Sequence, residues 1–236
     1  MKVIALIVLW TSCQCCVGGF GTNGIPDGSW DKTTKLTPLL VQLPAPSLGV
    51  NGAFSLPEGP HIEPVRSKLR APFLAPVGVT NVALGKRVTA SVATPVRGKF
   101  SMITDGSKEA FDFDLVEITN GVQWVQVDLE QECSIYAIVV WHNHYRLALF
   151  RGVVVQVADD ATFTTNVRTL FNNDYENLAG FGSGTDKQYF EDYPGKLIDT
   201  KGTKARYLRC YSDGSSNSPL NGYAEIEAWG LSAADK

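Results

Sequence analysis

The sequence predicts an all-β fold from about Asn81 to Gly230. In this part, short runs rich in Val, Ile, Tyr and Trp are separated by turns that contain Gly, Asn, Asp and Ser, which is the pattern of β-strands. No window keeps the apolar spacing of a helix for more than a turn or two. About 150 residues with strands at these intervals suit a single two-sheet sandwich that buries about two-thirds of the surface of the chain.

The first two clear strands lie in the middle of this segment. In QWVQVDL, residues 123–129, apolar residues alternate with Gln126 and Asp128, so one face of the strand is expected to be buried. The next run, SIYAIVVW at residues 134–141, is apolar on both faces. That is expected of a strand in the middle of a packed sheet.

Three more strands follow. GVVVQVA, residues 152–158, alternates again, and ARYLRCY (205–211) and YAEIEAWG (223–230) lie near the end of the chain. Leu208 and Cys210 fall on the same face of their strand, where a cysteine acts as a small buried hydrophobe. No internal repeat is visible, which argues against a solenoid or a propeller.

The cysteines do not form a disulfide framework. Three of the five lie in the N-terminal segment, which leaves Cys133 and Cys210 in the folded part. These two could form one bridge in an oxidising compartment, but the position of Cys210 favours two free thiols. A zinc site is poorly supported, because no CxxC pair lies outside the N-terminal segment.

Residues 1–18 resemble an export signal, because Met1-Lys2 precedes an apolar run that ends at Trp10 and is followed by small and polar residues. The run is shorter than the about 20 residues that a membrane span needs, so no transmembrane span is expected in the mature protein. Cys13 follows small residues and could carry a lipid anchor, whereas ordinary cleavage is an equal alternative. Either way, we expect a secreted or cell-envelope protein.

The rest of the chain divides by composition. Residues 19–80 contain nine of the 12 prolines, many glycines and no sustained periodicity, so we expect a low-complexity, mostly disordered tether. Within it, TKLTPLLVQL at residues 34–43 is apolar enough to pack against another surface. Residues 81–231 form the predicted sandwich, and residues 232–236 a short tail.

Composition and motifs exclude two broad classes of function. With 21 basic and 24 acidic residues and a net charge of −3, the chain lacks the basic face that nucleic-acid binding requires. No Gly-x-Ser-x-Gly elbow, HExxH pattern or Gly-rich phosphate loop before a helix is present. We therefore expect a protein without catalytic activity.

Seven segments, taken in order, resemble the discoidin, or coagulation factor 5/8 type C, domain: NVALGKRVTAS, MITDGS, QWVQVDL, IYAIVVW, VVVQVADD, KARYLRCYS and AEIEAWG. The resemblance extends over residues 81–230 and is strongest to members attached to secreted and envelope proteins of bacteria. These members are related to the galactose-binding-like carbohydrate-binding modules. The resemblance implies an antiparallel jelly-roll sandwich of about eight core strands.

The resemblance also implies a structural calcium ion. In many relatives, calcium lies at one edge of the sandwich and is held by backbone carbonyls of a loop like TDGS, by an acidic side chain there and by a glutamate of the last strand. Asp105 and Glu225 are the matching positions, and calcium tolerates the irregular geometry of a loop. The alternative is that Asp105 belongs to an ordinary turn and that Glu225 is an exposed strand residue.

Many relatives bind ligands, often sugars, at the opposite end of the sandwich. An aromatic ring can cover the apolar face of a pyranose while Asn, Arg and His groups bind its hydroxyls. The loop after Trp141 and a later loop supply such groups. The predicted ligand-binding residues are His142, His144, Tyr145, Arg146 and Asn217.

Other roles for this loop stay open. His142 and His144 are two residues apart and could bind a transition metal, but His61, the third histidine, lies in the tether and a third ligand is lacking. A purely structural role also competes, since a histidine after a strand can bind backbone carbonyls and Tyr145 can cover the core.

Two functions from different classes therefore remain. The first is an exported, noncatalytic module that binds a cell-surface or extracellular glycan through its end loops. The second is a protein-interaction or structural module of the envelope, which uses the same sandwich without a sugar pocket. A concave patch with an exposed aromatic residue at the end formed by residues 141–151 and 212–223 would favour the first. Loops filled by their own side chains would favour the second.

Overall fold

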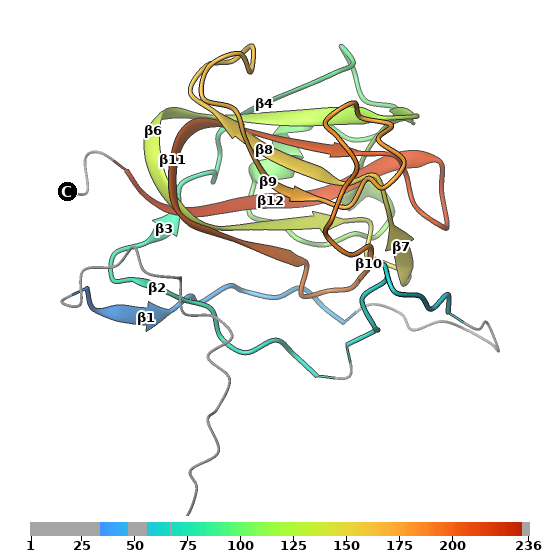
Figure 1. Cartoon of the computed structure of the whole chain (residues 1–236), viewed down its shortest axis with the longest axis horizontal. Helices are drawn as coiled ribbons and strands as arrows, with labels where there is room; N and C mark the ends of the chain where they lie inside the picture. Colours follow the sequence, from blue (N-terminus) through green and yellow to red (C-terminus); the bar gives the residue numbers. More distant parts are fainter. Residues whose placement is uncertain (1–33, 47–55, 67, 233–236) are drawn as a thin grey trace, which may run out of the picture.

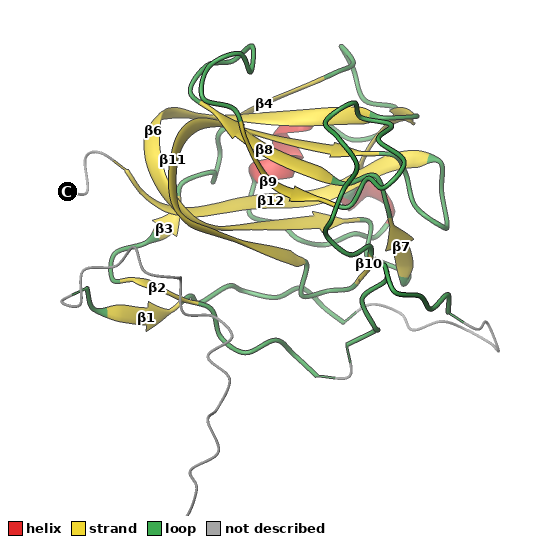
Figure 2. Ribbon diagram, viewed as in Figure 1, coloured by secondary structure: helices red, strands yellow, loops and turns green. Residues whose placement is uncertain are grey.

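The computed structural model describes residues 34–46, 56–66 and 68–232. These residues form a two-layer β-sandwich in which every pair of strands is antiparallel (Figures 1 and 2). The described residues contain no α-helix, only the short 3₁₀ helices η1 (Phe100–Thr104) and η2 (Asp112–Asp114). The predicted all-β, antiparallel fold is therefore confirmed.

Strand β6 (Gln123–His142) runs through both layers. Its first half pairs with β4 (Arg87–Ala90) and with the end of β11 (Lys196–Ser212); its second half pairs with the start of β11 and with β12 (Leu220–Ser232). The sequence predicted two strands here, and the structure joins them through a bend at Glu130, whose φ is +69°.

The bend in β6 is matched by a bend in its partner strand. The pairing register of β11 with β6 shifts between Asp199 and Thr203, next to Gly202, whose φ is +74°. A Cβ at Gly202 would lie 2.8 Å from the ring of Tyr136, so the turn requires glycine. Both long strands thus pass from one layer of the sandwich to the other at the same level (Figure 1).

The remaining strands complete the two layers. β8 (Val154–Ala158) and β9 (Arg168–Asn172) extend the first layer beyond β11. β3 (Thr80–Asn81) and β5 (Val116–Asn120) pair with β12 in the second layer. A separate pair, β7 (Ala148–Phe150) with β10 (Tyr189–Glu191), lies at the end of the sandwich where β6 stops.

The core follows the predicted alternation. Val125, Val127 and Leu129 are buried between the layers, as the pattern of the first half of β6 indicates. The second half is buried on both faces, as predicted: Ile138 belongs to the main core, whereas Trp141 belongs to a second cluster with Val139, Leu115, Ala110 and Ala224. The outer face of the second layer is therefore apolar and needs a cover.

Part of that cover comes from upstream of the sandwich. Val41 packs on the cluster of Trp141, and the Arg70 guanidinium donates hydrogen bonds to the carbonyls of Pro194 (2.6 Å) and Gly195 (3.0 Å). The described upstream residues also form the strand pair β1 (Leu36–Pro38) and β2 (Leu74–Pro76). These described residues of the predicted tether pack on the sandwich, because its apolar outer face gives them a surface.

Some predictions lie outside the described residues. The export signal at residues 1–18 and the lipid anchor at Cys13 belong to the first 33 residues, and nearly all of the predicted tail follows Ser232. Within residues 34–46, 56–66 and 68–232, no helix is long and apolar enough to span a membrane.

Both cysteines of the sandwich, Cys133 and Cys210, are buried thiols. Cys210 is fully buried, and this burial raises the pKa of its thiol well above the ordinary range. A thiol of this kind is inert while the protein is folded, because the reactive species is the thiolate.

We therefore predict that a chain with Cys13, Cys15 and Cys16 replaced by Ser has no thiol that reacts with a chromogenic disulfide reagent in the native state. After unfolding in denaturant without reductant, Cys133 and Cys210 should both react. Titration of released chromophore checks this. No reactive thiol after unfolding would mean that the two cysteines are bridged.

Candidate ligand-binding site

The segment WHNHYR lies where β6 leaves the sheet. Trp141 is fully buried, and its indole Nε1 donates a hydrogen bond to the carbonyl of Tyr193 at 2.9 Å. Gly195 approaches so closely that a Cβ there would lie 2.7 Å from the indole ring. The contacts of Trp141 thus fix the end of β6 and the start of the segment that follows it.

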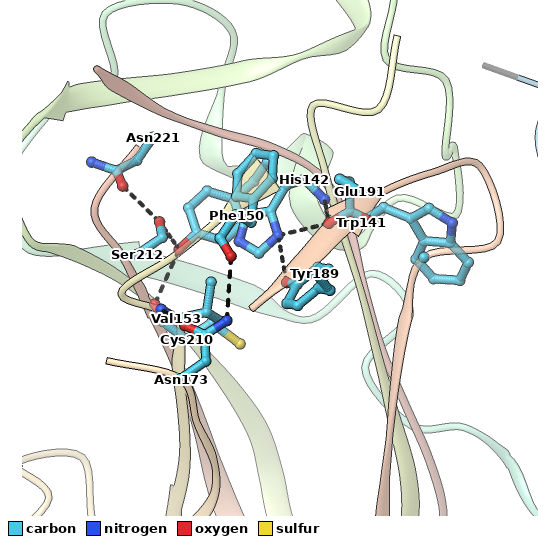
Figure 3. A network of polar contacts seen from close by, with 12 residues as sticks. Trp141, His142, Phe150, Val153, Asn173, Tyr189, Glu191, Cys210, Ser212 and Asn221 are labelled. Carbon is cyan, nitrogen blue, oxygen red and sulfur yellow. Dashed lines mark hydrogen bonds and ion pairs between the residues drawn. The ribbon is translucent and has the colours of Figure 1, made fainter. Parts of the chain in front are cut away.

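His142 is fully buried and lies among Phe150 of β7 and Tyr189 and Glu191 of β10 (Figure 3). Its Nδ1 lies 3.0 Å from the Glu191 carboxylate and 3.3 Å from the Tyr189 hydroxyl. Its ring stacks on Phe150, with ring centroids 4.4 Å apart. This residue joins β6 to the β7–β10 pair and does not reach the surface, so it is removed from the predicted ligand contacts.

His144 is also buried, because its ring faces the loop that follows η1. Its Nε2 donates to the Lys108 carbonyl at 2.7 Å. The two histidines therefore turn to different partners and do not form a shared metal site. Like His142, His144 is buried and bound to groups of the chain itself, and neither histidine lines the pocket beside Tyr145.

Buried amides and hydroxyls fix the neighbouring loops (Figure 3). The Asn221 carboxamide oxygen accepts from the Ser212 hydroxyl at 2.7 Å and from the Gly214 N–H at 2.9 Å. Asn173 accepts from the Val153 N–H at 2.7 Å and donates to the Phe150 carbonyl at 3.3 Å. These buried hydrogen bonds tie the end loops to strands β7, β11 and β12.

The other three predicted residues meet around one pocket. Tyr145, which is half-buried, and the exposed Arg146 and Asn217 line a cavity of about 130 Å³, together with Asn143. The Arg146 guanidinium lies 5.8 Å from the centre of the Tyr145 ring, and the Asn217 amide donates to the Leu147 carbonyl at 3.2 Å. Residues from two separate loops thus form a concave surface with an aromatic ring and several polar groups.

Phe111, which the sequence analysis did not single out, extends this surface, and Phe113 is a second exposed aromatic residue of the same segment. Phe111 is 56% exposed and its ring lies 4.7 Å from that of Tyr145, while Phe113 is 82% exposed. Exposed aromatic side chains beside a polar pocket mark interaction sites. The signal in the sequence was FDFD, where two aromatic residues alternate with charged ones outside any predicted strand.

A second cavity lies at the same end. It has a volume of about 290 Å³ and is lined mainly by polar residues, including Arg151, Asp174, Tyr175 and Asp213. Arg151 directly follows Phe150, which lines the first pocket. The two cavities therefore adjoin the same stretch of chain.

The residues expected to bind calcium lie together, but not as a set of free oxygen ligands. The Glu225 Oε1 accepts from the Gly106 N–H at 3.1 Å, and the Asp105 carboxylate, which is exposed, accepts from the Ser107 N–H at 2.8 Å. Burial raises the pKa of the Glu225 carboxyl to about 9, against the opposing effect of the Lys108 ammonium. Among the described residues, no three His, Cys, Asp or Glu side chains are grouped so as to hold a metal ion.

No protein-family model matches the chain, and no curated protein sequence matches it. Solved structures do. A family 89 glycoside hydrolase from Clostridium perfringens, in complex with 2-acetamido-1,2-dideoxynojirmycin, is 17% identical over 66% of this chain, with a TM-score of 0.48. The chain spans only 15% of the length of that hydrolase.

Two smaller proteins match over nearly their whole length. Chitosan-binding module 1, from a chitosanase/glucanase of Paenibacillus sp. IK-5, is 21% identical; the match covers 64% of this chain and 99% of the module, with a TM-score of 0.44. A fucose-binding module of Streptococcus pneumoniae is 16% identical; the match covers 63% of this chain and 96% of the module, with a TM-score of 0.43. These structural neighbours are carbohydrate-binding modules.

The buried position of His142 predicts a loss of stability when it is truncated. His142→Ala removes the partner of Glu191 and the ring that stacks on Phe150, so the free energy of unfolding should fall by about 2–4 kcal/mol. Arg146→Ala, four residues further on and exposed, should change it by less than about 0.5 kcal/mol. Urea denaturation of both variants measures the difference, and equal stabilities would contradict the structural role of His142.

The raised pKa of Glu225 predicts a pH effect on stability. The folded-state pKa of Glu225, about 9, lies above the ordinary value of 4.5. Its contribution to the free energy of unfolding is therefore complete below pH 4.5 and is lost as the pH rises toward 9. The side chain of the Glu225→Gln variant cannot titrate. Over this pH range the free energy of unfolding should therefore fall less steeply for the variant than for the unchanged protein, with a difference in slope of up to about 1.4 kcal/mol per pH unit. Urea denaturation from pH 5 to 9 measures the free energy of unfolding of both proteins. If it depends on pH with the same slope in both, the Glu225 carboxyl is not buried as described.

Proposed function

We propose that this protein is a noncatalytic module that binds carbohydrate in the pocket formed by Tyr145, Arg146 and Asn217. The observation that carries the proposal is the concave surface of about 130 Å³ that is lined by the half-buried Tyr145, whose ring contacts the exposed ring of Phe111. The rings of Tyr145 and Phe111 can cover the apolar face of a sugar. The amides and the guanidinium can bind its hydroxyls, since they offer several donors in fixed planes.

The charges around the pocket favour binding over hydrolysis. Glycoside hydrolysis requires two carboxyl groups on opposite sides of the bond that is cleaved. Among the described residues that line the pocket, Glu117 is the one acid, and its carboxylate lies 3.3 Å from the Arg97 guanidinium. A single carboxylate that is already paired does not supply an acid and a nucleophile.

The alternative, a protein-interaction or structural module, predicts end loops filled by their own side chains. The cavity beside Tyr145 and the exposure of Phe111 favour a ligand of the size of a sugar residue instead. Export to the cell surface or the medium completes the proposal on the basis of the N-terminal sequence alone, with a lipid anchor at Cys13 as the alternative to ordinary cleavage. A glycan of a cell surface or of the extracellular medium is then the expected partner, with other envelope proteins as further partners.

The proposal is tested by a glycan array probed with the full chain, followed by calorimetric titration of the best glycan. Tyr145→Ala and Arg146→Ala should each weaken binding at least about tenfold, or about 1.4 kcal/mol, because each removes a stacking surface or a charged hydrogen-bond donor. Arg87→Ala is the matched control, because Arg87 is exposed on β4 and does not line the pocket.

Two results would count against this function. One is that the protein binds no glycan of the array. The other is affinity that survives both pocket substitutions, with the variants folded as judged by an unchanged melting temperature.

A further inference from the structure

The side chain of Lys108 is buried at the edge of the sandwich. It is only 8% exposed, yet its ammonium has partners in three directions. Nζ lies 2.7 Å from the Glu227 Oε1 and donates to the Gly106 carbonyl at 3.1 Å. It also lies 5.3 Å from the centre of the Trp141 indole. A buried ammonium is stable only when it is paired and hydrogen-bonded in this way.

The partner of Lys108 is itself fully engaged. Glu227 is 3% exposed, and its second oxygen, Oε2, accepts from the Trp229 indole at 2.9 Å. The Lys108 backbone is fixed as well, because its carbonyl accepts from His144. Both ends of this lysine are therefore held by the second layer of the sandwich and by the end of β6.

The Lys108 ammonium lies at the position where the resemblance predicts a calcium ion. Calcium needs six to eight oxygen ligands at about 2.4 Å, and the carbonyls of the TDGS loop were expected to supply several. The Gly106 carbonyl is bound by Lys108 at 3.1 Å, so an ion on that oxygen would lie at most about 5.5 Å from the ammonium. Two cations so close in a buried site repel each other.

The expected ligands do not offset this repulsion. Asp105 is exposed and bonded to its own loop, and Glu225 uses Oε1 for the Gly106 N–H. One further oxygen, the Glu225 Oε2, is buried without a hydrogen bond among the described residues. Calcium requires six to eight oxygen ligands, and this single side-chain oxygen adds little to the loop carbonyls, of which the Gly106 carbonyl is already bound by Lys108. The residues present do not fit the ion.

We propose that the Lys108 ammonium is the built-in cation of this loop, in the place that the resemblance to discoidin domains assigns to calcium. The loop of residues 105–111 is then held by the Lys108–Glu227 pair and folds without a divalent ion. This inference does not depend on the proposed ligand, because it concerns the stability of the sandwich.

The first test is the melting temperature of the full chain after dialysis against EDTA and after addition of calcium. The proposal predicts a change of less than about 1 °C. A structural calcium present at about 100 times its Kd would instead raise the melting temperature by about 5–10 °C. A rise of that size that Glu225→Gln abolishes would overturn the proposal.

The second test removes the internal cation. Lys108→Met keeps an unbranched apolar side chain but leaves Glu227 buried without its charged partner, so the melting temperature should fall by at least about 6 °C. Lys204→Met is the control, because the Lys204 side chain is 60% exposed and lies 4.0 Å from Glu132, so no change is expected.

A double variant keeps the test decisive if Lys108→Met does not fold. Lys108→Met with Glu227→Gln removes both charges and should recover at least half of the lost melting temperature, because neither charge is then buried alone. A Lys108→Met protein as stable as the Lys204→Met control would contradict the proposal. So would a double variant that is less stable than the single one.

Discussion

The pairing of β6 along its whole length is the constraint on which the rest of the structure depends. This strand lies between β4 or β12 on one side and β11 on the other, so its backbone is paired on both edges. Its bend at Glu130 carries it from one layer to the other, and its second half is buried on both faces. Because β6 is paired on both edges and its second half is buried on both faces, it ends at a defined residue. The position of that end determines where the side chains that follow His142 point.

The end of β6 divides the WHNHYR segment into two roles. Trp141, His142 and His144 turn inward, and each has a partner far away in sequence, namely Tyr193, Glu191 and Lys108. Tyr145 and Arg146 come next and reach the pocket. The inward contacts hold the loop that presents the outward ones, and His144 also holds the loop that carries Phe111 to the Tyr145 ring. Rigid support of this kind is what precise ligand recognition needs.

The sequence predicted what depends on local pattern. Alternation in residues 123–129 identified the buried face of β6 because neighbouring side chains of a strand point in opposite directions. It could not reveal that His142 is buried, because an imidazole inside the core depends on Glu191, 49 residues away. The exposure of Phe111 and the site on the Trp141 cluster where Val41 packs were not predicted for the same reason, as both depend on which surfaces the finished sandwich leaves open. Lys108 likewise reads as a surface residue until Glu227 is seen beside it.

The central claim is that the end of β6 separates supporting residues from ligand-binding ones. A crystal structure of the chain with the glycan that it binds best tests this most directly. The account predicts a sugar ring against Tyr145, with hydroxyls bonded to Arg146 and Asn217, and with His142 still paired to Glu191. A glycan bound on another face of the sandwich, or one in direct contact with His142, would contradict it.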